Sequence, residues 1–177
     1  MSQAPPAPVE VGTTRGFEPP TNTQFGVFLD NKVGKLLDLA DVFRGQALTL
    51  AGITVVETAD HAVVRIVTSR ADLARRLLTR AQLPFSETEV LVVEVGGFGK
   101  NLSMLCSSLL AAELNIKYIY PLLVQPRGLP TLVVHTDDML LSAQILRRKL
   151  FTLFGENDLG ENRPHTSPGT PDDPMPD

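Results

Sequence analysis

Residues 36–50 read LLDLADVFRGQALTL and residues 102–116 read LSMLCSSLLAAELNI, so one pattern occurs twice in the chain. With Leu36 set against Leu102, most apolar positions coincide, and the polar Thr49 falls opposite Asn115. The matched apolar pairs are Leu36 and Leu102, Leu39 and Leu105, Ala40 and Cys106, Phe43 and Leu109, Leu48 and Leu114, and Leu50 and Ile116. A repeat of this length is a structural unit, and two such units span residues 24–86 and 90–154.

The residues around the first copy predict the order strand, helix, strand, strand, helix. Apolar residues at helical spacing after Lys35 favour a helix, and the runs that follow are rich in β-branched residues. A second helix begins at a cap, either Ser69 or Asp72, and ends before Pro84. The expected elements are a strand over 24–29, a helix over 35–47, strands over 48–58 and 61–68, and a helix ending near residue 81.

The second copy predicts the same order, with a glycine-rich turn at residues 96–101 before its first helix. Asp137 is expected to cap its second helix. The expected elements are a helix over 102–113, strands over 115–124 and 129–136, a helix reaching 149 and a closing strand over 151–154. The strand over 87–95 can close the first unit, open the second, or do both across a bend; its length favours the last.

These patterns predict an α+β fold made of two ferredoxin-like βαββαβ units. Each unit has an antiparallel sheet with its helices on one face. The other sheet face and the sheet edges remain available for pairing, and we therefore expect a homodimer.

The two ends of the chain differ from its middle. The chain has 177 residues and a net charge of −4, and residues 1–22 hold five prolines. Residues 155–177 hold five more prolines and six acidic residues against one arginine. Such segments bury too little apolar surface to fold, so both are expected to be disordered tails. The expected domains are residues 23–88 and 89–154, which should fold without either tail and are too weakly basic to favour nucleic-acid binding.

Cysteine content and hydropathy indicate a soluble, cytoplasmic protein that does not enter a membrane. Cys106 is the only cysteine, so no disulfide can form within one chain. Its place in the apolar stripe of a helix predicts a buried thiol. The N-terminal residues contain no apolar signal core, and no run approaches 18 apolar residues.

The stretch Phe28-Leu29-Asp30-Asn31-Lys32-Val33-Gly34-Lys35-Leu36 resembles the opening of an ACT domain, a small βαββαβ module that binds amino acids and regulates metabolic enzymes. That family shows an acidic residue or Asn, then Asn, two residues, Gly and an apolar helix start; Asp30, Asn31, Gly34 and Leu36 fill these places. The repeat as a whole is similar to tandem ACT proteins of bacteria. The resemblance implies a small amino acid ligand and a regulated metabolic enzyme as partners. The ligand-binding residues that it implies are Asp30, Asn31, Lys32, Val33, Gly34, Lys35, Leu36, Thr49, Gly99, Asn101 and Asn115.

The chemistry of this first turn suits an amino acid. The N-terminus of a helix presents unpaired N–H groups that attract a carboxylate. Gly34 lets the backbone approach a ligand closely, and Asn31 can both donate and accept hydrogen bonds. The simpler alternative is that Asn31 and Gly34 only form a tight turn and start the helix.

The two units depart from the family pattern in different ways. The second unit lacks the Asn-x-x-Gly arrangement, since Gly99 lies one place earlier than Gly34 does and Lys100 takes the matching place. The first unit has Thr49 where family members commonly carry a ligand-contacting Asn, whereas the second has Asn115. Each half thus keeps part of the polar set. Either one complete site is shared between the units or one site has been lost.

The sequence shows no constellation typical of an enzyme. The three histidines are scattered, no Cys/His spacing suggests zinc, and no phosphate loop is present. No cofactor is expected. Tyr118 and Tyr120 alternate with Ile119, which places both rings on one sheet face for packing or ligand contact. The leading hypothesis is a non-catalytic regulatory protein that binds a small amino acid at the interface of the two units. The alternative is a protein-interaction module with degenerate ligand sites.

Overall fold

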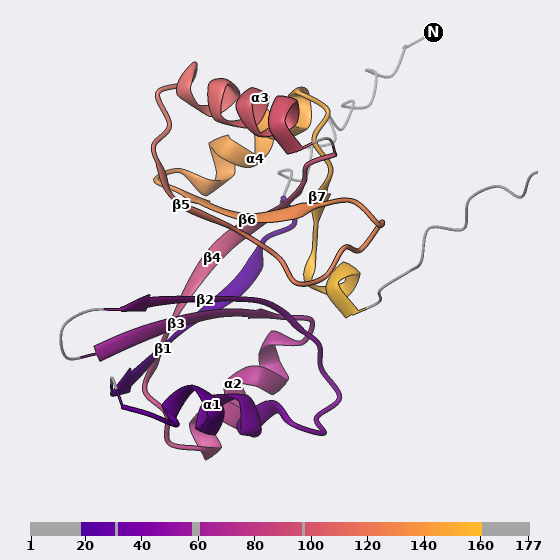
Figure 1. Cartoon of the computed structure of the whole chain (residues 1–177). Coiled ribbons are helices and arrows are strands. Elements are labelled where there is room, and N and C mark those ends of the chain that lie inside the picture. The colour runs from indigo at the N-terminus through magenta and orange to yellow at the C-terminus, as the bar shows by residue number, and fades with distance from the viewer. Residues whose placement is uncertain (1–18, 31, 58–60, 97, 161–177) are drawn as a thin grey trace, which may run out of the picture.

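The computed structural model describes residues 19–30, 32–57, 61–96 and 98–160. Two βαββαβ units follow one another along the chain (Figure 1), so the α+β fold class predicted from the repeat is confirmed. The elements are β1 Asn22–Asp30, α1 Lys35–Phe43, β2 Leu50–Glu57, β3 His61–Thr68, α2 Ala71–Arg80, β4 Phe85–Glu94, α3 Phe98–Leu110, β5 Ile116–Pro121, β6 Thr131–Thr136, α4 Met139–Arg148, β7 Leu153–Phe154 and the 3-10 helix η1 Glu156–Gly160.

The first unit forms an antiparallel sheet in the order β2-β3-β1-β4. Alternate residues of β1 point to opposite faces, and Phe25, Val27 and Leu29 pack against the helices. Leu39 and Phe43 of α1 and Ala74 and Leu78 of α2 complete this core. The helix α1 ends at Phe43 rather than at Ala47, because Gly45 follows with a φ of 71° that no helix accommodates.

The second unit repeats this arrangement in the order β5-β6-β4-β7, and neighbouring strands are antiparallel. Its core includes Leu105, Leu109, Leu132 and Leu146. The helix α3 begins at Phe98, so the expected turn at residues 96–101 mostly belongs to the helix. The cap of α4 is Asp138, whose Oδ1 accepts from the N–H of Leu141 at 2.9 Å; the prediction that Asp137 caps it was wrong.

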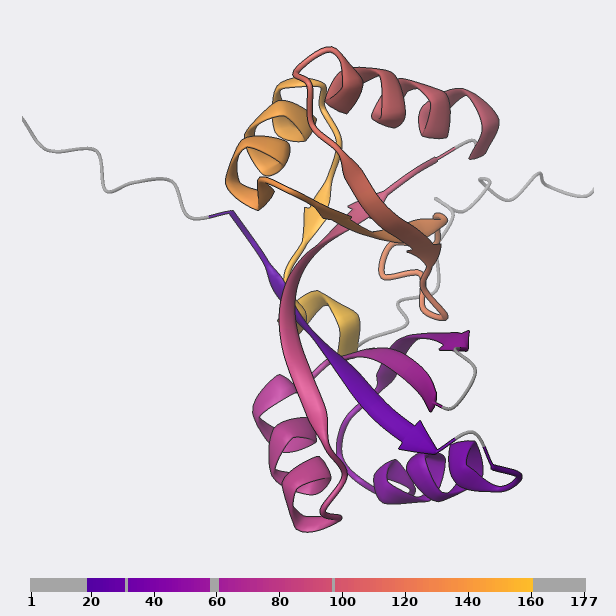
Figure 2. The ribbon, with the colours of Figure 1, turned by 90° about the vertical axis from the view of Figure 1, so that its left-hand side faces the viewer.

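The strand β4 belongs to both units. Its first part, residues 85–90, pairs with β1, while residues 91–94 pair with β6 and residues 92–93 with β7. This strand passes from one unit to the other in Figure 2. Because β4 serves both sheets, the two units share one continuous backbone ladder.

The sheet faces that carry no helices pack against each other. In Figures 1 and 2, α1 and α2 lie outside one sheet, and α3 and α4 lie outside the other. A third apolar cluster fills the space between the sheets: Ala51, Val67, Val90, Val92, Tyr120, Leu122, Val133, Phe154 and Leu159. The expectation that these faces stay open for pairing with other chains was therefore wrong, since each unit covers the other.

The two sheets approach most closely at Gly52 of β2. A Cβ built on Gly52 would lie 2.6 Å from Cδ2 of Leu122 and 3.5 Å from Cε2 of Tyr120. The N–H of Leu123 also donates to the carbonyl of Ala51 at 2.8 Å, which ties the β5–β6 connection to β2. Glycine at this position lets the second unit sit directly on the first.

The fold continues past the expected end at residue 154. In η1, Leu159 is 1% exposed and lies in the cluster between the sheets. The carboxylate of Glu156 accepts from the N–H of Ala71, the first residue of α2. Residues 155–160 thus join the end of the second unit to the first unit and are part of the folded structure. None of the helices in the described ranges is long and apolar enough to cross a membrane.

Candidate functional site

The first turn, between β1 and α1, has an open and polar surface. Gly34 stands at the start of α1 with a φ of 91°, and a Cβ placed there would meet no atom within 4 Å. Nζ of Lys32 donates to Oδ2 of Asp30 at 3.1 Å, and this bond lowers the pKa of Asp30. Lys35 makes a similar bond to Asp38 at 3.0 Å. Asn31, expected to contact the ligand, lies outside the described residues.

Thr49 lies at the far end of α1 from the first turn. The nine residues of α1 extend about 13.5 Å, so Gly34 and Thr49 of one chain cannot hold the same small ligand. The N–H of Thr49 donates to Oγ of Ser69 at 2.9 Å, and the N–H of Ser69 donates back to the carbonyl of Thr49 at 3.0 Å. These two bonds fix the start of β2 beside the start of α2.

Thr49 faces a hollow of about 420 Å³ under η1. The guanidinium of Arg70 borders this hollow and donates to the carbonyl of Ala47 at 3.1 Å. The lining residues are Gln46, Ala47, Leu48, Thr49, Ser69, Arg70, Asn157 and Gly160. The hollow is polar, but its arginine already has a backbone partner.

The second unit places its predicted residues at the two ends of α3. Gly99 and Asn101 lie in the first turn of that helix, and Asn115 lies beyond its end, just before β5. The N–H of Asn115 donates to Oδ1 of Asp137 at 3.1 Å, and the N–H of Asp137 donates to the carbonyl of Asn115 at 3.2 Å. Thr49 and Asn115 are thus held by equivalent pairs of bonds in the two units.

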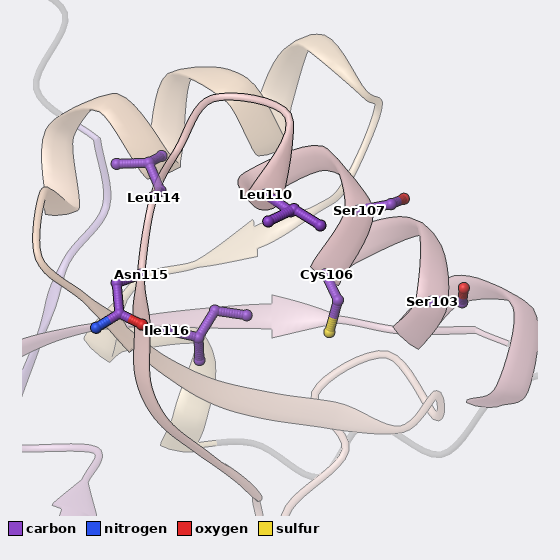
Figure 3. A pocket seen from close by; sticks show the side chains of 7 residues that line it. All are labelled: Ser103, Cys106, Ser107, Leu110, Leu114, Asn115 and Ile116. Carbon is purple, nitrogen blue, oxygen red and sulfur yellow. The ribbon is translucent and has the colours of Figure 1, made fainter.

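A groove of about 450 Å³ runs between α3 and β5, and Asn115 lines it. Figure 3 shows Cys106 and Leu110 projecting from α3 and Ile116 from β5, with Asn115 and Ser103 toward opposite ends. The lining residues are Ser103, Cys106, Ser107, Leu110, Leu114, Asn115 and Ile116. The volume falls within the range of small-molecule sites, roughly 300–1,000 Å³.

The groove combines an apolar floor with neutral polar groups. Leu110, Leu114 and Ile116 supply the apolar surface, and Asn115 supplies an amide that donates and accepts hydrogen bonds. The hydroxyl of Ser107 donates to the carbonyl of Met104 at 3.1 Å, which leaves its oxygen able to accept a further bond. Cys106 is exposed here, so the prediction of a buried thiol was wrong.

Of the predicted site residues that the structure describes, only Asn115 lines this groove, and Thr49 lines the hollow under η1. Neither space is lined by Asp30, the described residues 32–36, Gly99 or Asn101. Sequence reasoning missed Ser103, Cys106, Ser107 and Leu110. Their spacing was a usable signal, since they recur every three or four residues on the helical face opposite the buried Leu105 and Leu109.

A polar cluster holds the two sheets together at one place. Nε2 of Gln24 donates to the hydroxyl of Tyr118 at 2.8 Å, and the hydroxyl of Tyr120 donates to Oε1 of Gln24 at 2.8 Å. The guanidinium carbon of Arg65 lies 4.1 Å from the centre of the Tyr118 ring, and the ring of His135 stacks on Tyr118 at 4.9 Å. The two tyrosines do share one sheet face, where they pack at the junction of the units. No group of metal-ligating side chains occurs among the described residues.

A family profile described as an ACT domain pair matches residues 20–162. No curated protein matches the chain significantly.

Solved structures share the fold. Protein BT0572 from Bacteroides thetaiotaomicron superposes with a TM-score of 0.73 at 22% identity, over 81% of this chain and 98% of that one. The ligand-free regulatory subunit of aspartate kinase from Thermus thermophilus superposes with a TM-score of 0.52 at 8% identity, over 73% of this chain and 93% of that one.

Proposed function

This chain belongs to the ACT domain pair family, and we propose that it is a non-catalytic regulatory protein that binds a small amino acid. The groove between α3 and β5 carries the proposal, because it is lined by Asn115. Thr49 and Asn115 occupy matching places in the repeat, and the resemblance assigns both to ligand contact. The family is a regulatory one, and no catalytic family is indicated by the comparisons.

We place the ligand at the outer edge of a unit rather than between the two sheets of one chain. The contact between the sheets is filled by apolar side chains such as Val92, Val133 and Leu159. The edge, in contrast, offers an open groove with an amide, two hydroxyls and an apolar floor. A zwitterion needs donors for its carboxylate and acceptors for its ammonium group, and this set supplies both.

If the first turn also contacts the ligand, it must come from a second copy of the chain. Within one chain, α1 and α3 lie in opposite outer layers (Figure 1), so Gly34 and Asn115 cannot serve one ligand. Exposed apolar side chains flank both places: Val33, Leu36 and Leu37 beside the first turn, and Leu110 beside the groove. We propose a homodimer in which the first turn of one chain completes the groove of its partner.

Calorimetric titration of the full chain with the twenty amino acids tests the proposal. We expect one or a few amino acids to bind with micromolar to millimolar affinity, as a few charge-assisted hydrogen bonds allow. Asn115→Ala should weaken binding at least several-fold. Asn157→Ala is the matched control, because it removes an exposed amide from the hollow under η1 and should change nothing.

The alternative is an interaction module whose ligand sites have degenerated. One observation favours it: the matching edge of the first unit carries an ion pair between Arg44 and Asp41 where the second unit has its groove. A chain that binds none of the twenty amino acids, yet still forms its dimer, would be such a module.

A further inference from the structure

The repeat allows the two outer edges to be compared position by position. In the register that sets Leu36 against Leu102, the groove residues Ser107 and Leu110 match Asp41 and Arg44. The guanidinium of Arg44 forms an ion pair with the carboxylate of Asp41. The edge of the first unit is therefore charged where the edge of the second unit is neutral and apolar.

We infer that the chain binds one ligand per protomer, in the groove between α3 and β5, and that this ligand is a neutral amino acid with an apolar side chain. The inference rests on the proposed function and adds the class of ligand. The side chain would lie on Leu110, Leu114 and Ile116, while the amide of Asn115, which both donates and accepts, faces the zwitterion.

The lining of the groove selects against charged side chains. None of its seven residues is a Lys, Arg, His, Asp or Glu. A ligand such as lysine or aspartate finds no side chain of opposite charge among these seven residues, and its charge would lie against their apolar surface without gain. An apolar side chain instead covers Leu110, which is 74% exposed, and so removes apolar surface from water.

The size of the apolar floor also discriminates among neutral ligands. A pocket contact with one methylene group changes affinity by roughly 10-fold or more. Glycine and alanine reach less of the surface formed by Leu110, Leu114 and Ile116 than leucine, isoleucine, valine or methionine do. We therefore expect the larger apolar amino acids to bind at least about 10-fold more tightly than alanine.

Titration of the full chain with two sets of amino acids tests this inference. The first set is leucine, isoleucine, valine and methionine, and the second is aspartate, glutamate, lysine and arginine. We expect a member of the first set to bind with a stoichiometry of one per chain, and the second set to bind at least 10-fold more weakly.

A variant pair connects the binding to the groove. Leu110→Arg places in the second unit the residue that the first unit has at the matching position; it should abolish binding of the apolar ligand or weaken it at least 10-fold. Leu140→Arg is the matched control: Leu140 is an exposed leucine of the neighbouring helix α4 that does not line the groove. That variant should bind as the wild type does, and melting curves check that both variants fold.

The outcomes separate this inference from the proposed function. Tighter binding of a charged amino acid, two equivalents per chain, or unchanged binding by Leu110→Arg would each overturn the inference while the regulatory proposal stands. If none of the twenty amino acids binds to the wild type, the proposed function fails and the inference fails with it.

Discussion

Gly34 and Gly99 stand near the starts of α1 and α3, but only Gly34 has a backbone that requires glycine. Its φ of 91° is one that side chains with a Cβ rarely adopt. Gly99 lies inside the first turn of α3, where other residues are accepted. A Cβ on either would meet no atom within 4 Å, so substitution would disturb no packing at either position.

This difference predicts what valine does at the two positions. Gly34→Val should cost roughly 1–2 kcal/mol of stability from backbone strain and should abolish amino acid binding if the first turn holds the ligand carboxylate. Asn31→Ala should weaken binding by roughly 1–3 kcal/mol. Calorimetry and thermal shift measure both effects.

Gly99→Val is the control for the first turn and should change binding less. If Gly34→Val and Asn31→Ala both bind the ligand as well as the wild type does, the first turn takes no part in the site.

His135 links the stability of the junction to pH. Burial lowers the pKa of His135, and the positive charges of Lys117 and Arg65 lower it further, while a bond between its Nδ1 and the carbonyl of Glu89 opposes the shift. The folded state therefore binds fewer protons than the unfolded state just below the ordinary histidine pKa of about 6.5. The stabilisation from His135 is present above that pH and is lost as the pH falls through the lowered value.

We expect the melting temperature of the wild type to fall more steeply between pH 7 and pH 5 than that of His135→Phe. Phenylalanine keeps a ring beside Tyr118 but does not titrate, so it removes the pH dependence. It also loses the bond to the carbonyl of Glu89, which changes the melting temperature but not its slope with pH. Equal slopes for the wild type and His135→Phe would show that His135 does not cause the pH dependence.

Among the elements, η1 has more effect on the fold than its length suggests. Its Leu159 side chain lies in the apolar cluster between the sheets, and its Glu156 carboxylate meets the positive end of α2. Nδ2 of Asn22 in β1 also donates to the carbonyl of Phe154, the last residue of β7, at 2.8 Å. These contacts hold the end of the second unit against the first.

Two truncations distinguish the contribution of η1 to stability from that of the residues that follow it. Ending the chain after Gly160 should leave the melting temperature nearly unchanged. Ending it after Phe154 removes a buried leucine and a helix cap, together worth roughly 3 kcal/mol, which corresponds to a decrease of about 10 °C. Leu159→Ala in the full chain should reproduce much of this loss, and equal stability of the two truncations would contradict the assigned role.

At the scale of the whole molecule, the outer edges are the surfaces left for assembly. The described sheet ends in β2 on one side and β5 on the other. Unpaired strand edges favour association. Val55 of the edge strand β2 is exposed, and so is Leu37 of the outer helix α1. Because the two sheet faces cover each other, the edges and the outer helices remain for a second chain.

We expect sedimentation at tens of micromolar to show a dimer of the wild type. Leu37→Lys combined with Val55→Lys should shift the equilibrium toward the monomer, because each charge would be buried at the contact. Leu150→Lys changes a leucine that is exposed on the second unit and should leave the dimer intact. A wild-type monomer, with and without amino acids, would rule out the proposed assembly.

The repeat in the sequence determined the two βαββαβ units and their element order, and the length of the strand over 87–95 favoured its sharing between them. Local patterns sufficed here, because apolar period and turn residues depend on near neighbours along the chain. The match of Thr49 with Asn115 likewise placed both residues at equivalent points of the two units. The resemblance to ACT domains rested on these same short-range features.

Only the tertiary structure decided what covers each apolar surface. The pattern of β1, β2 and β5 shows that both sheet faces are partly apolar, but it does not say that Gly52 and Leu122 bring these faces together. The exposure of Cys106 and the packing of Leu159 also depend on residues far away in the sequence. The groove at Asn115 arises from the separation of α3 and β5. Packing between distant parts of the chain sets this separation, and the local periodicity of the sequence does not predict it.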